Sequence, residues 1–277
     1  MTIDYLILGH MTADIVPNDR WLGGTVSYAA PAAKAFGRQV GIVTSARDDD
    51  PLLAELRQNS EVVNIPADVT TTFENVYKTE GRVQYLHEIA RPILFEDIPE
   101  AWRSAKFVHL APLVNELDPK IAESFPQARI MATPQGWIRK WGDDKRVRFK
   151  PWFDVEALKL IDIVVMSVED IHESPDMEEK FVPHVQTLVI TDGAKGGRYY
   201  VDGQRYEYDA VPVDVVDLTG AGDIFATALF ASLANIDDIH LAVKMASRMA
   251  GISTTRTQLS SAPTPQEIET AYRELMG

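Results

Sequence analysis

Strand and helix patterns alternate through the first quarter of the chain. In chain order they are a strand at 3–8, a helix at 29–36, a strand at 40–44, a helix at 51–58 and a strand at 61–65. Such alternation is typical of a parallel sheet whose crossover helices cover both faces. The 277 residues allow one large α/β domain or two small ones. We predict one doubly wound α/β domain with a mostly parallel sheet over residues 1–277.

The alternation breaks at residues 71–90, which predict a β-hairpin. Two stretches of alternating residues, 71–78 and 82–89, flank the turn signal T-E-G at 79–81. A hairpin inserted into a doubly wound domain projects from the sheet, so we expect a lid over a ligand cleft. An ordinary surface hairpin is the alternative. The lid side chains expected to face a ligand or a second subunit are Asn75, Tyr77, Arg82 and Gln84.

Charge and residue composition limit the partners of this domain. With a formal net charge of −14 and a pI near 4.8, the chain lacks the excess of cations that binds nucleic acid or an anionic membrane. It has no cysteines, which excludes disulfides and thiolate metal sites. The N-terminal apolar run is far shorter than the ~18 residues of a membrane span. We therefore expect a cytoplasmic protein without nucleic-acid or membrane partners.

Residues 213–233 join a short β-branched run, a glycine turn and an apolar helix. Gly220, Ala221 and Gly222 permit a tight turn that brings backbone N–H groups close to a ligand where the helix begins. Asp223 follows in the first helical turn, where the helix dipole favours an ionised carboxylate that is available as a base. The alternative is structural, with a plain turn and an acid that stabilises the helix. Neither the P-loop pattern nor the dinucleotide-binding pattern G-x-G-x-x-G fits this turn.

Two segments far apart in the sequence carry a family resemblance. The stretch D-L-T-G-A-G-D-I-F at 217–225 resembles the signature D-T-x-G-A-G-D-x-F of the ribokinase-like (PfkB) carbohydrate kinases and departs from it at Leu218. The glycine pair before the helix at 29–36 is similar to the family's G-G-x-x-x-N element, although Thr25 and Tyr28 replace its usual Lys and Asn. The resemblance covers nearly the whole chain. It implies a ribokinase-like fold with a β lid and a kinase that uses ATP and Mg²⁺.

The acceptor site is expected at the carboxyl end of the first strand, because ligands of open α/β sheets bind at that edge. Asp14 follows this strand, and its carboxylate is suited to accept hydrogen bonds from substrate hydroxyls; a mere turn residue is the alternative. The resemblance implies the same role for an acidic residue here. It also implies a reduced lid, because the segment between Asp14 and Gly23 is shorter than in ribokinases. The substrate-binding residues predicted here are Asp14, Gly23, Gly24 and Ser27, together with Asn75 of the lid.

A distinctive loop at residues 133–141, T-P-Q-G-W-I-R-K-W, follows a predicted strand. Arg139 is suited to neutralise phosphate and the indoles to wall a ring-shaped substrate, while Gln135 adds an amide at the sheet edge. Ordinary packing or a subunit contact is the alternative. Together with V-H-L-A-P-L-V-N-E at 108–116, the loop resembles the inositol kinase branch of the family. That resemblance implies myo-inositol or another cyclitol as the acceptor.

The resemblance assigns the phosphoryl donor to a glycine-rich turn at 191–196, T-D-G-A-K-G. This turn stands at the family's T-x-G-x-x-G element, which contacts the nucleotide. A plain β-turn is the alternative. The nucleotide-binding residues predicted are Thr191, Gly193, Gly196 and Thr219.

Two positions are assigned to ions by the same resemblance. The stretch S-V-E-D stands where the family has N-x-x-E, so Glu169 and Asp170 would hold a hydrated Mg²⁺, which binds through one or two carboxylates plus phosphate oxygens. A helix start with acidic residues is the alternative. Asp217 would contribute to a K⁺ or other monovalent-cation site, near which Gln258 replaces a usual glycine.

These features predict transfer of the γ-phosphoryl group of ATP to a hydroxyl of a small polyol. Asp223 would take the proton from the attacking hydroxyl, and the N–H groups of residues 220–223 would stabilise the transferring phosphoryl group. A furanose-sugar or nucleoside kinase is the alternative within the family. An alternative of another class is a catalytically weak nucleotide- or polyol-binding protein, motivated by Thr25, Tyr28 and the altered S-x-E-D. We expect a monomer or a homodimer.

Overall fold

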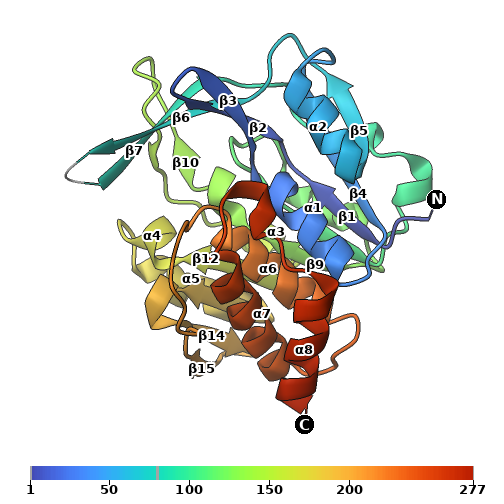
Figure 1. The fold of residues 1–277 in the computed structure, drawn as a ribbon, viewed down its shortest axis with the longest axis vertical. Helices are drawn as coiled ribbons and strands as arrows, with labels where there is room; N and C mark the ends of the chain where they lie inside the picture. The colour runs from blue at the N-terminus through green and yellow to red at the C-terminus, as the bar shows by residue number, and fades with distance from the viewer. Residues whose placement is uncertain (1, 79–80, 277) are drawn as a thin grey trace.

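The computed structural model describes residues 2–78 and 81–276, and its centre is a nine-stranded sheet (Figure 1). The strand order is β15-β14-β13-β12-β9-β8-β1-β4-β5. The strands from β13 to β5 in this order run parallel, and β14 and β15 form an antiparallel extension. This confirms the predicted doubly wound, mostly parallel α/β fold.

Most strands of the large sheet are largely buried, whereas β5 at one edge and the extension β14 and β15 at the other are partly exposed. In chain order they are β1 (Tyr5–Leu8), β4 (Val40–Ala46), β5 (Glu61–Pro66), β8 (Phe107–Leu110), β9 (Arg129–Ala132), β12 (Ile163–Ser167), β13 (Thr187–Thr191), β14 (Gly197–Val201) and β15 (Gln204–Tyr208).

The two faces of the sheet build two separate cores from the same strands. In β1, Tyr5 and Ile7 join one core and Leu6 and Leu8 the other, because successive strand residues point to opposite faces. All four side chains are completely buried, as expected for a parallel strand covered on both sides. The sheet therefore needs helices on both faces.

Long helices cover the Tyr5 face, and short α- and 3₁₀-helices cover the Leu6 face (Figure 1). The first group is α1 (Thr25–Ala35), α2 (Pro51–Asn59), α6 (Ala221–Ser232), α7 (Ile239–Ser253) and α8 (Pro265–Met276). The second includes α3 (Val155–Leu158), α4 (Val168–Ile171), α5 (Asp176–Phe181), η1 (Phe95–Asp97), η2 (Glu100–Trp102), η3 (Pro119–Ser124), η4 (Pro134–Gly136) and η5 (Val182–His184). In the described part of the chain, no helix has both the length and the apolar character needed to cross a membrane.

A second sheet of four strands, in the order β3-β2-β6-β7, forms the lid (Figure 1). The predicted hairpin supplies β6 (Thr72–Lys78) and β7 (Gly81–Glu88). Its turn at 79–80 lies outside the described residues, as do the side chains of Tyr77 and Arg82. The segment between Asp14 and Gly23, whose shortness implied a lid reduced relative to ribokinases, belongs to a second hairpin, β2 (Thr12–Val16) and β3 (Asp19–Gly23), whose β2 strand pairs with β6 in parallel.

A two-stranded ribbon borders the lid. Its strands are β10 (Arg139–Lys140) and β11 (Arg148–Phe149), and the loop between them reaches β7. The N–H of Leu86 donates to the carbonyl of Lys145 at 2.8 Å, and the N–H of Val147 donates to that of Gln84 at 2.9 Å. These hydrogen bonds connect the ribbon that begins with Arg139 to the lid.

One buried histidine joins both ends of the lid hairpin to the end of β1. The Nε2 of His10 lies 2.9 Å from the carbonyl of Arg91, which can only accept, so Nε2 carries a proton. The hydroxyl of Thr71 lies 2.8 Å from Nδ1 of His10 and accepts the N–H of Ala90 at 3.0 Å. Glu116, only 3% exposed, accepts the N–H of His10 at 3.1 Å. The base of the lid is thus fixed to the carboxyl edge of the sheet.

Candidate active site

The glycine turn before α6 requires glycine at residue 220. Gly220 has φ 78°, in the left-handed region, and immediately precedes the first residue of α6. A Cβ at this position would lie 2.3 Å from Cδ1 of Tyr28 in α1. The turn and the ring of Tyr28 therefore pack directly against each other. The irregular segment at 209–219 leads into this turn, and its Val215, Val216 and Leu218 are exposed.

Asp223 lies in the first turn of α6, half-buried. Burial raises the pKa of its carboxyl group to about 6, and the hydrogen bond from the Thr25 hydroxyl opposes this shift. The charge of Asp170 raises the pKa further, and the charge of Arg139 lowers it. Asp223 is therefore ionised at neutral pH and more basic than an ordinary aspartate, as a general base should be.

Tyr28 links three carboxylates of the site. Burial raises the pKa of its phenol, and the nearby charges of Asp223, Asp14 and Asp217 add to the effect. The phenol therefore remains protonated and can donate a hydrogen bond among these acids. Its position shows that the two ends of the chain meet here, since Asp14 belongs to the lid and Asp217 and Asp223 flank the glycine turn.

Four of the residues predicted to bind the acceptor lie in β2 and at the junction of β3 and α1, on the segment that leads to Tyr28. Asp14 in β2 accepts a hydrogen bond from the Thr12 hydroxyl at 2.9 Å. A Cβ at Gly23 would lie 2.5 Å from Oδ2 of Asp14, so glycine lets that carboxylate lie across β3. Gly24 is the N-cap of α1 with φ 85°. The buried Ser27 donates its hydroxyl to the carbonyl of Gly23 at 2.7 Å, which holds the turn.

The lid and the distinctive loop contribute amides and a cation. In the lid, Nε2 of Gln84 donates to Oδ1 of Asn75 at 3.1 Å. In η4, Nε2 of Gln135 donates to Oδ1 of Asp170 at 3.4 Å. Arg139 begins β10 and lies close enough to Asp223 to influence its pKa. The loop therefore lies beside the carboxylates at the start of α6 and of α4.

The predicted magnesium ligands occupy the short helix after β12. Asp170 accepts from the N–H of Ser167 at 2.9 Å and from its hydroxyl at 3.1 Å, so it caps α4. Glu169 beside it is exposed. Within residues 2–78 and 81–276, no cluster of three or more metal-binding side chains is preformed. Two adjacent carboxylates at the mouth of the site still fit a hydrated Mg²⁺ that takes its remaining ligands from phosphate and water.

The predicted donor turn lies on the neighbouring strand. Thr191 ends β13 directly opposite Ser167 of β12, which places the turn beside α4. Gly193, the first residue of η6 (Gly193–Lys195), has φ 51°, and Gly196, directly after η6, has φ 84°. A Cβ at Gly196 would lie 2.0 Å from the carbonyl oxygen of Tyr208, so this position also requires glycine.

Asp217 and Thr219 close the turn that precedes α6. Oδ1 of Asp217 accepts the N–H of Thr219 at 2.9 Å and its hydroxyl at 2.7 Å. Oδ2 accepts the N–H of Gln258 at 3.3 Å, at the start of η7 (Gln258–Ser261). Asp217, assigned above to a monovalent cation, thus receives hydrogen bonds on both oxygens from the chain itself. Through these hydrogen bonds Asp217 connects the segment before the glycine turn to the start of η7.

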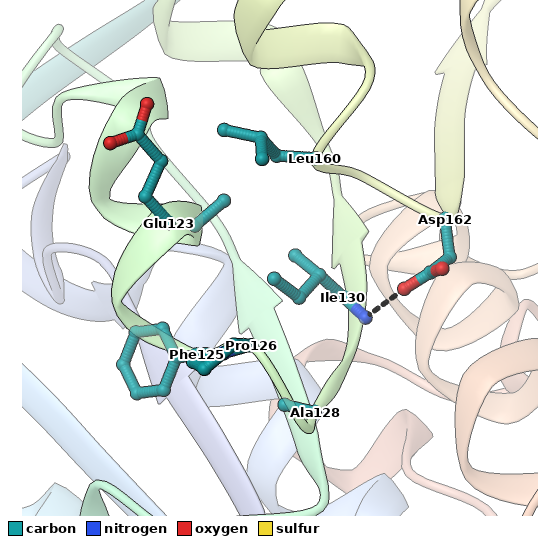
Figure 2. A pocket seen from close by; sticks show the side chains of 8 residues that line it. Glu123, Phe125, Pro126, Ala128, Ile130, Leu160 and Asp162 are labelled. Atoms are coloured by element: carbon teal, nitrogen blue, oxygen red, sulfur yellow. Dashed lines mark hydrogen bonds between the residues drawn. The ribbon is translucent and has the colours of Figure 1, made fainter.

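A shallow hollow elsewhere on the molecule lies away from these groups (Figure 2). It surrounds the amino ends of β9 and β12, where the N–H of Ile130 donates to Oδ2 of Asp162 at 2.6 Å. Asp170 follows the opposite, carboxyl end of β12. The hollow therefore lies at the wrong edge of the sheet to share a ligand with Asp223.

Two residues at the site were noticed in the sequence only as departures from a family pattern. Thr25 donates to Asp223, and Tyr28 contacts Gly220 and lies near three acids. Their only sequence signal is their place directly after the glycine pair. Nothing in the chain itself indicates that residue 28 meets residue 220.

Comparison with known proteins agrees with this architecture. Residues 156–267 match the family described as pfkB family carbohydrate kinase. A cytidine kinase of Thermococcus kodakarensis is 26% identical over 83% of this chain and 88% of its own length. A pyrophosphate-dependent kinase in the ribokinase family, solved with a pyrophosphate analog and myo-inositol, superposes with a TM-score of 0.78, 21% identity and coverage of 96% of this chain and 99% of its own. A ribokinase from Thermotoga maritima gives a TM-score of 0.76 at 17% identity, covering 98% and 99%.

The chain has the fold of the ribokinase family over nearly its whole length. Its residues 156–267 match the model of the pfkB family of carbohydrate kinases.

Proposed function

We propose that this protein transfers the γ-phosphoryl group of ATP to a hydroxyl of a ring-shaped polyol, with myo-inositol or another cyclitol as the acceptor. The observation that carries the proposal is the position of Asp223, a half-buried carboxylate with a pKa of about 6 at the start of α6. Arg139 of the ribbon lies near it, and Asp14 of the lid lies, like Asp223, near Tyr28.

Asp223 acts as the general base. It takes the proton from the attacking hydroxyl, and its raised pKa brings its basicity closer to neutral pH, where such catalysis is most effective. The hydrogen bond from Thr25 holds one orientation of the carboxylate. Asp14 accepts a hydrogen bond from another hydroxyl of the acceptor and so fixes which hydroxyl faces Asp223.

The start of α6 stabilises the transferring phosphoryl group. The first N–H groups of a helix have no intrahelical acceptor, and in α6 that of Ala221 donates to the carbonyl of Leu218 at 3.2 Å, so the proposed donors are the N–H groups of Gly222 and Asp223. One such donor contributes about 3 kcal/mol to transition-state stabilisation in other enzymes. Arg139 adds a positive charge. Glu169 and Asp170 would hold a hydrated Mg²⁺, which would supply positive charge to the donor phosphates.

The choice of acceptor rests on the site and on similarity. Segments 108–116 and 133–139 resemble the inositol kinase branch, and a structure with this fold has been solved with myo-inositol. A nucleoside or furanose acceptor is the second candidate, because a cytidine kinase matches most of the chain. The same structural relative favours pyrophosphate as the second candidate donor.

A matrix of donors and acceptors tests the proposal. Product formation is measured for ATP, ADP and pyrophosphate, each with myo-inositol, D-ribose, D-fructose and cytidine. We expect the highest kcat/KM for ATP with myo-inositol. A higher value for cytidine would select the second candidate, and thermal stabilisation by ligands without product in any combination would identify a binding protein.

A further inference from the structure

The strand β3 places one large aromatic side chain, that of Trp21, on the face opposite to the one that packs against α1 and α2. Arg20 pairs with Asp50, the N-cap of α2, at 3.1 Å, and Leu22 is buried in the core beneath α1 and α2. Both side chains lie on the same face of β3, because strand residues two apart point the same way. Trp21 stands between them, so its indole points to the opposite face.

That opposite face is the one that carries the acceptor-side residues. Trp21 is the direct cross-strand partner of Asp14 in the β2–β3 pair, and such partners project from the same side of a sheet. In the β2–β6 pair Asp14 faces Phe73, and Asn75, two residues further on, shares that side. The indole, the Asp14 carboxylate and the Asn75 amide therefore occupy one face of the lid.

The same face looks toward the carboxyl edge of the large sheet. Near the base of the lid, Phe73 and Leu86 are buried against Leu113 and Val114, which follow β8. Asp14 is the partner of Phe73 in the neighbouring strand and lies near Tyr28, whose ring contacts the glycine turn. Trp21 lies next to Asp14 on the edge strand β3, and its side chain is exposed.

Trp21 is 49% exposed, whereas the other four tryptophans are buried or half-buried. A single exposed apolar residue needs no explanation in itself. Here, however, the pleat and the register place the indole beside a carboxylate that is suited to bind hydroxyls. An aromatic face next to a hydroxyl acceptor is suited to a ligand with one apolar and one polar side. A cyclitol or sugar ring has that form, with C–H groups on its faces and hydroxyls on its edge.

We propose that Trp21 is a specificity-determining residue that packs against the C–H face of a ring-shaped acceptor while Asp14 binds one of its hydroxyls. The inference rests on the proposed function and extends it to the choice between cyclic and open-chain polyols. The negative face of the indole attracts the polarised C–H groups of the ring. An open-chain polyol presents no such face and gains little from the indole.

Kinetics with myo-inositol and competition by D-glucitol, an open-chain polyol of six hydroxyls, test this role. We expect Trp21→Ala to raise the KM for myo-inositol about tenfold, equivalent to about 1.4 kcal/mol, with kcat within about twofold of wild type. Trp21→Phe should recover most of the loss, and the inhibition constant of D-glucitol should stay unchanged. The matched control is Phe153→Ala, which removes another exposed aromatic residue, 45% exposed, that packs on Phe181 away from the lid.

Acrylamide quenching of tryptophan fluorescence provides a readout that does not require turnover. Myo-inositol should protect the wild-type protein from quenching and should give no protection in Trp21→Phe. Unchanged KM and unchanged quenching in a protein that phosphorylates myo-inositol would overturn the role of Trp21 and leave the proposed function standing. Protection by myo-inositol without product formation would contradict the proposed function alone. If the wild-type protein is a dimer in solution and Trp21→Ala is a monomer with unchanged KM, the indole is a subunit contact. That result would also overturn the inference.

Discussion

The start of α6 and the lid sheet differ in how they are built. The glycine turn and Asp223 lie within a few residues of each other and depend on local backbone geometry, with a left-handed Gly220 directly before the helix. The lid assembles β2 and β3 with β6 and β7, which are about fifty residues later in the sequence. The groups proposed for phosphoryl transfer thus lie in one short segment, whereas the proposed acceptor surface is assembled by pairing between distant strands.

This difference predicts two kinds of variant. Changes at the α6 start should lower kcat, because they alter groups that act on the transferring phosphoryl group. Changes in the lid should raise the KM of the acceptor, because they alter the surface that holds it.

The largest effect besides that of Asp223 itself is expected for Gly220→Ala. The new Cβ would lie 2.3 Å from the ring of Tyr28, and the φ of 78° disfavours alanine. We expect kcat to fall about 10²- to 10³-fold, as for loss of an oxyanion donor, and the free energy of unfolding to fall by about 1–3 kcal/mol. Steady-state kinetics and urea unfolding measure the two effects.

Gly203→Ala is the matched control for that variant. Gly203 also has a left-handed φ of 81°, but no described atom lies within 4 Å of a Cβ built there. It should therefore lose some stability and keep its kcat. Equal losses of kcat in both variants would show that the close approach of Gly220 and Tyr28 is unimportant for turnover.

A smaller effect is expected when the base of the lid is loosened. His10→Ala removes the imidazole that bridges Thr71 and Arg91. Because the lid hairpin loses this anchor, we expect the acceptor KM to rise about fivefold, with the donor KM unchanged. Loss of these buried hydrogen bonds should also lower the unfolding free energy by about 1–3 kcal/mol.

His87→Gln provides the comparison for His10→Ala. It removes the half-exposed contact between Nε2 of His87 and Oε2 of Glu74 in the same lid, at 2.9 Å, and should leave both KM values within about twofold of wild type. If the acceptor KM does not respond to His10→Ala in folded protein, the lid does not hold the acceptor as proposed.

The smallest effect is expected for Thr25→Val and depends on pH. The Thr25 hydroxyl stabilises the ionised form of Asp223 and so lowers its pKa; its removal should raise that pKa above the wild-type value of about 6. Wild-type kcat/KM should rise with pH through about 6, and the variant should follow the same curve at a higher pH. The rate should fall about two- to fivefold near pH 6 and stay unchanged near pH 8.5. A shift of the variant's pH profile toward lower pH would contradict the hydrogen bond from Thr25 to Asp223.

The contrast between the two regions also explains which features could be predicted from sequence. The parallel sheet followed from buried strands such as residues 3–8 alternating with helix patterns, and the structure confirms it. The role of Asp223 remains a prediction that its local geometry supports. The β2–β3 hairpin was missed, although Pro17 and Asn18 are turn residues and Asn18 adopts φ 66°.

Other features depend on contacts that no local pattern encodes. Trp21 gains its place only from pairing with Asp14, and Tyr28 only from its approach to Gly220. The pKa of Asp223 depends on burial and on three other segments, because burial and Asp170 raise it while Thr25 and Arg139 lower it. Such long-range relations are set by the whole fold, so sequence patterns could indicate the chemistry but not its surroundings.

The central claim is that Asp223 removes the proton from the acceptor hydroxyl, and Asp223→Asn tests it most directly. Its folding should survive, because a carboxyl with a raised pKa stabilises the folded state only at low pH and loses that contribution as the pH rises through about 6. At pH 8 the neutral amide should therefore be no less stable than the carboxylate. Asp214→Asn, at an exposed aspartate nearby, is the control.

The measurement is kcat at pH 8 with saturating donor and acceptor, together with calorimetric binding of each ligand. We predict that Asp223→Asn lowers kcat by about 10²- to 10⁴-fold while both ligands still bind and Asp214→Asn behaves as wild type. Turnover of Asp223→Asn within a few-fold of wild type would contradict the account.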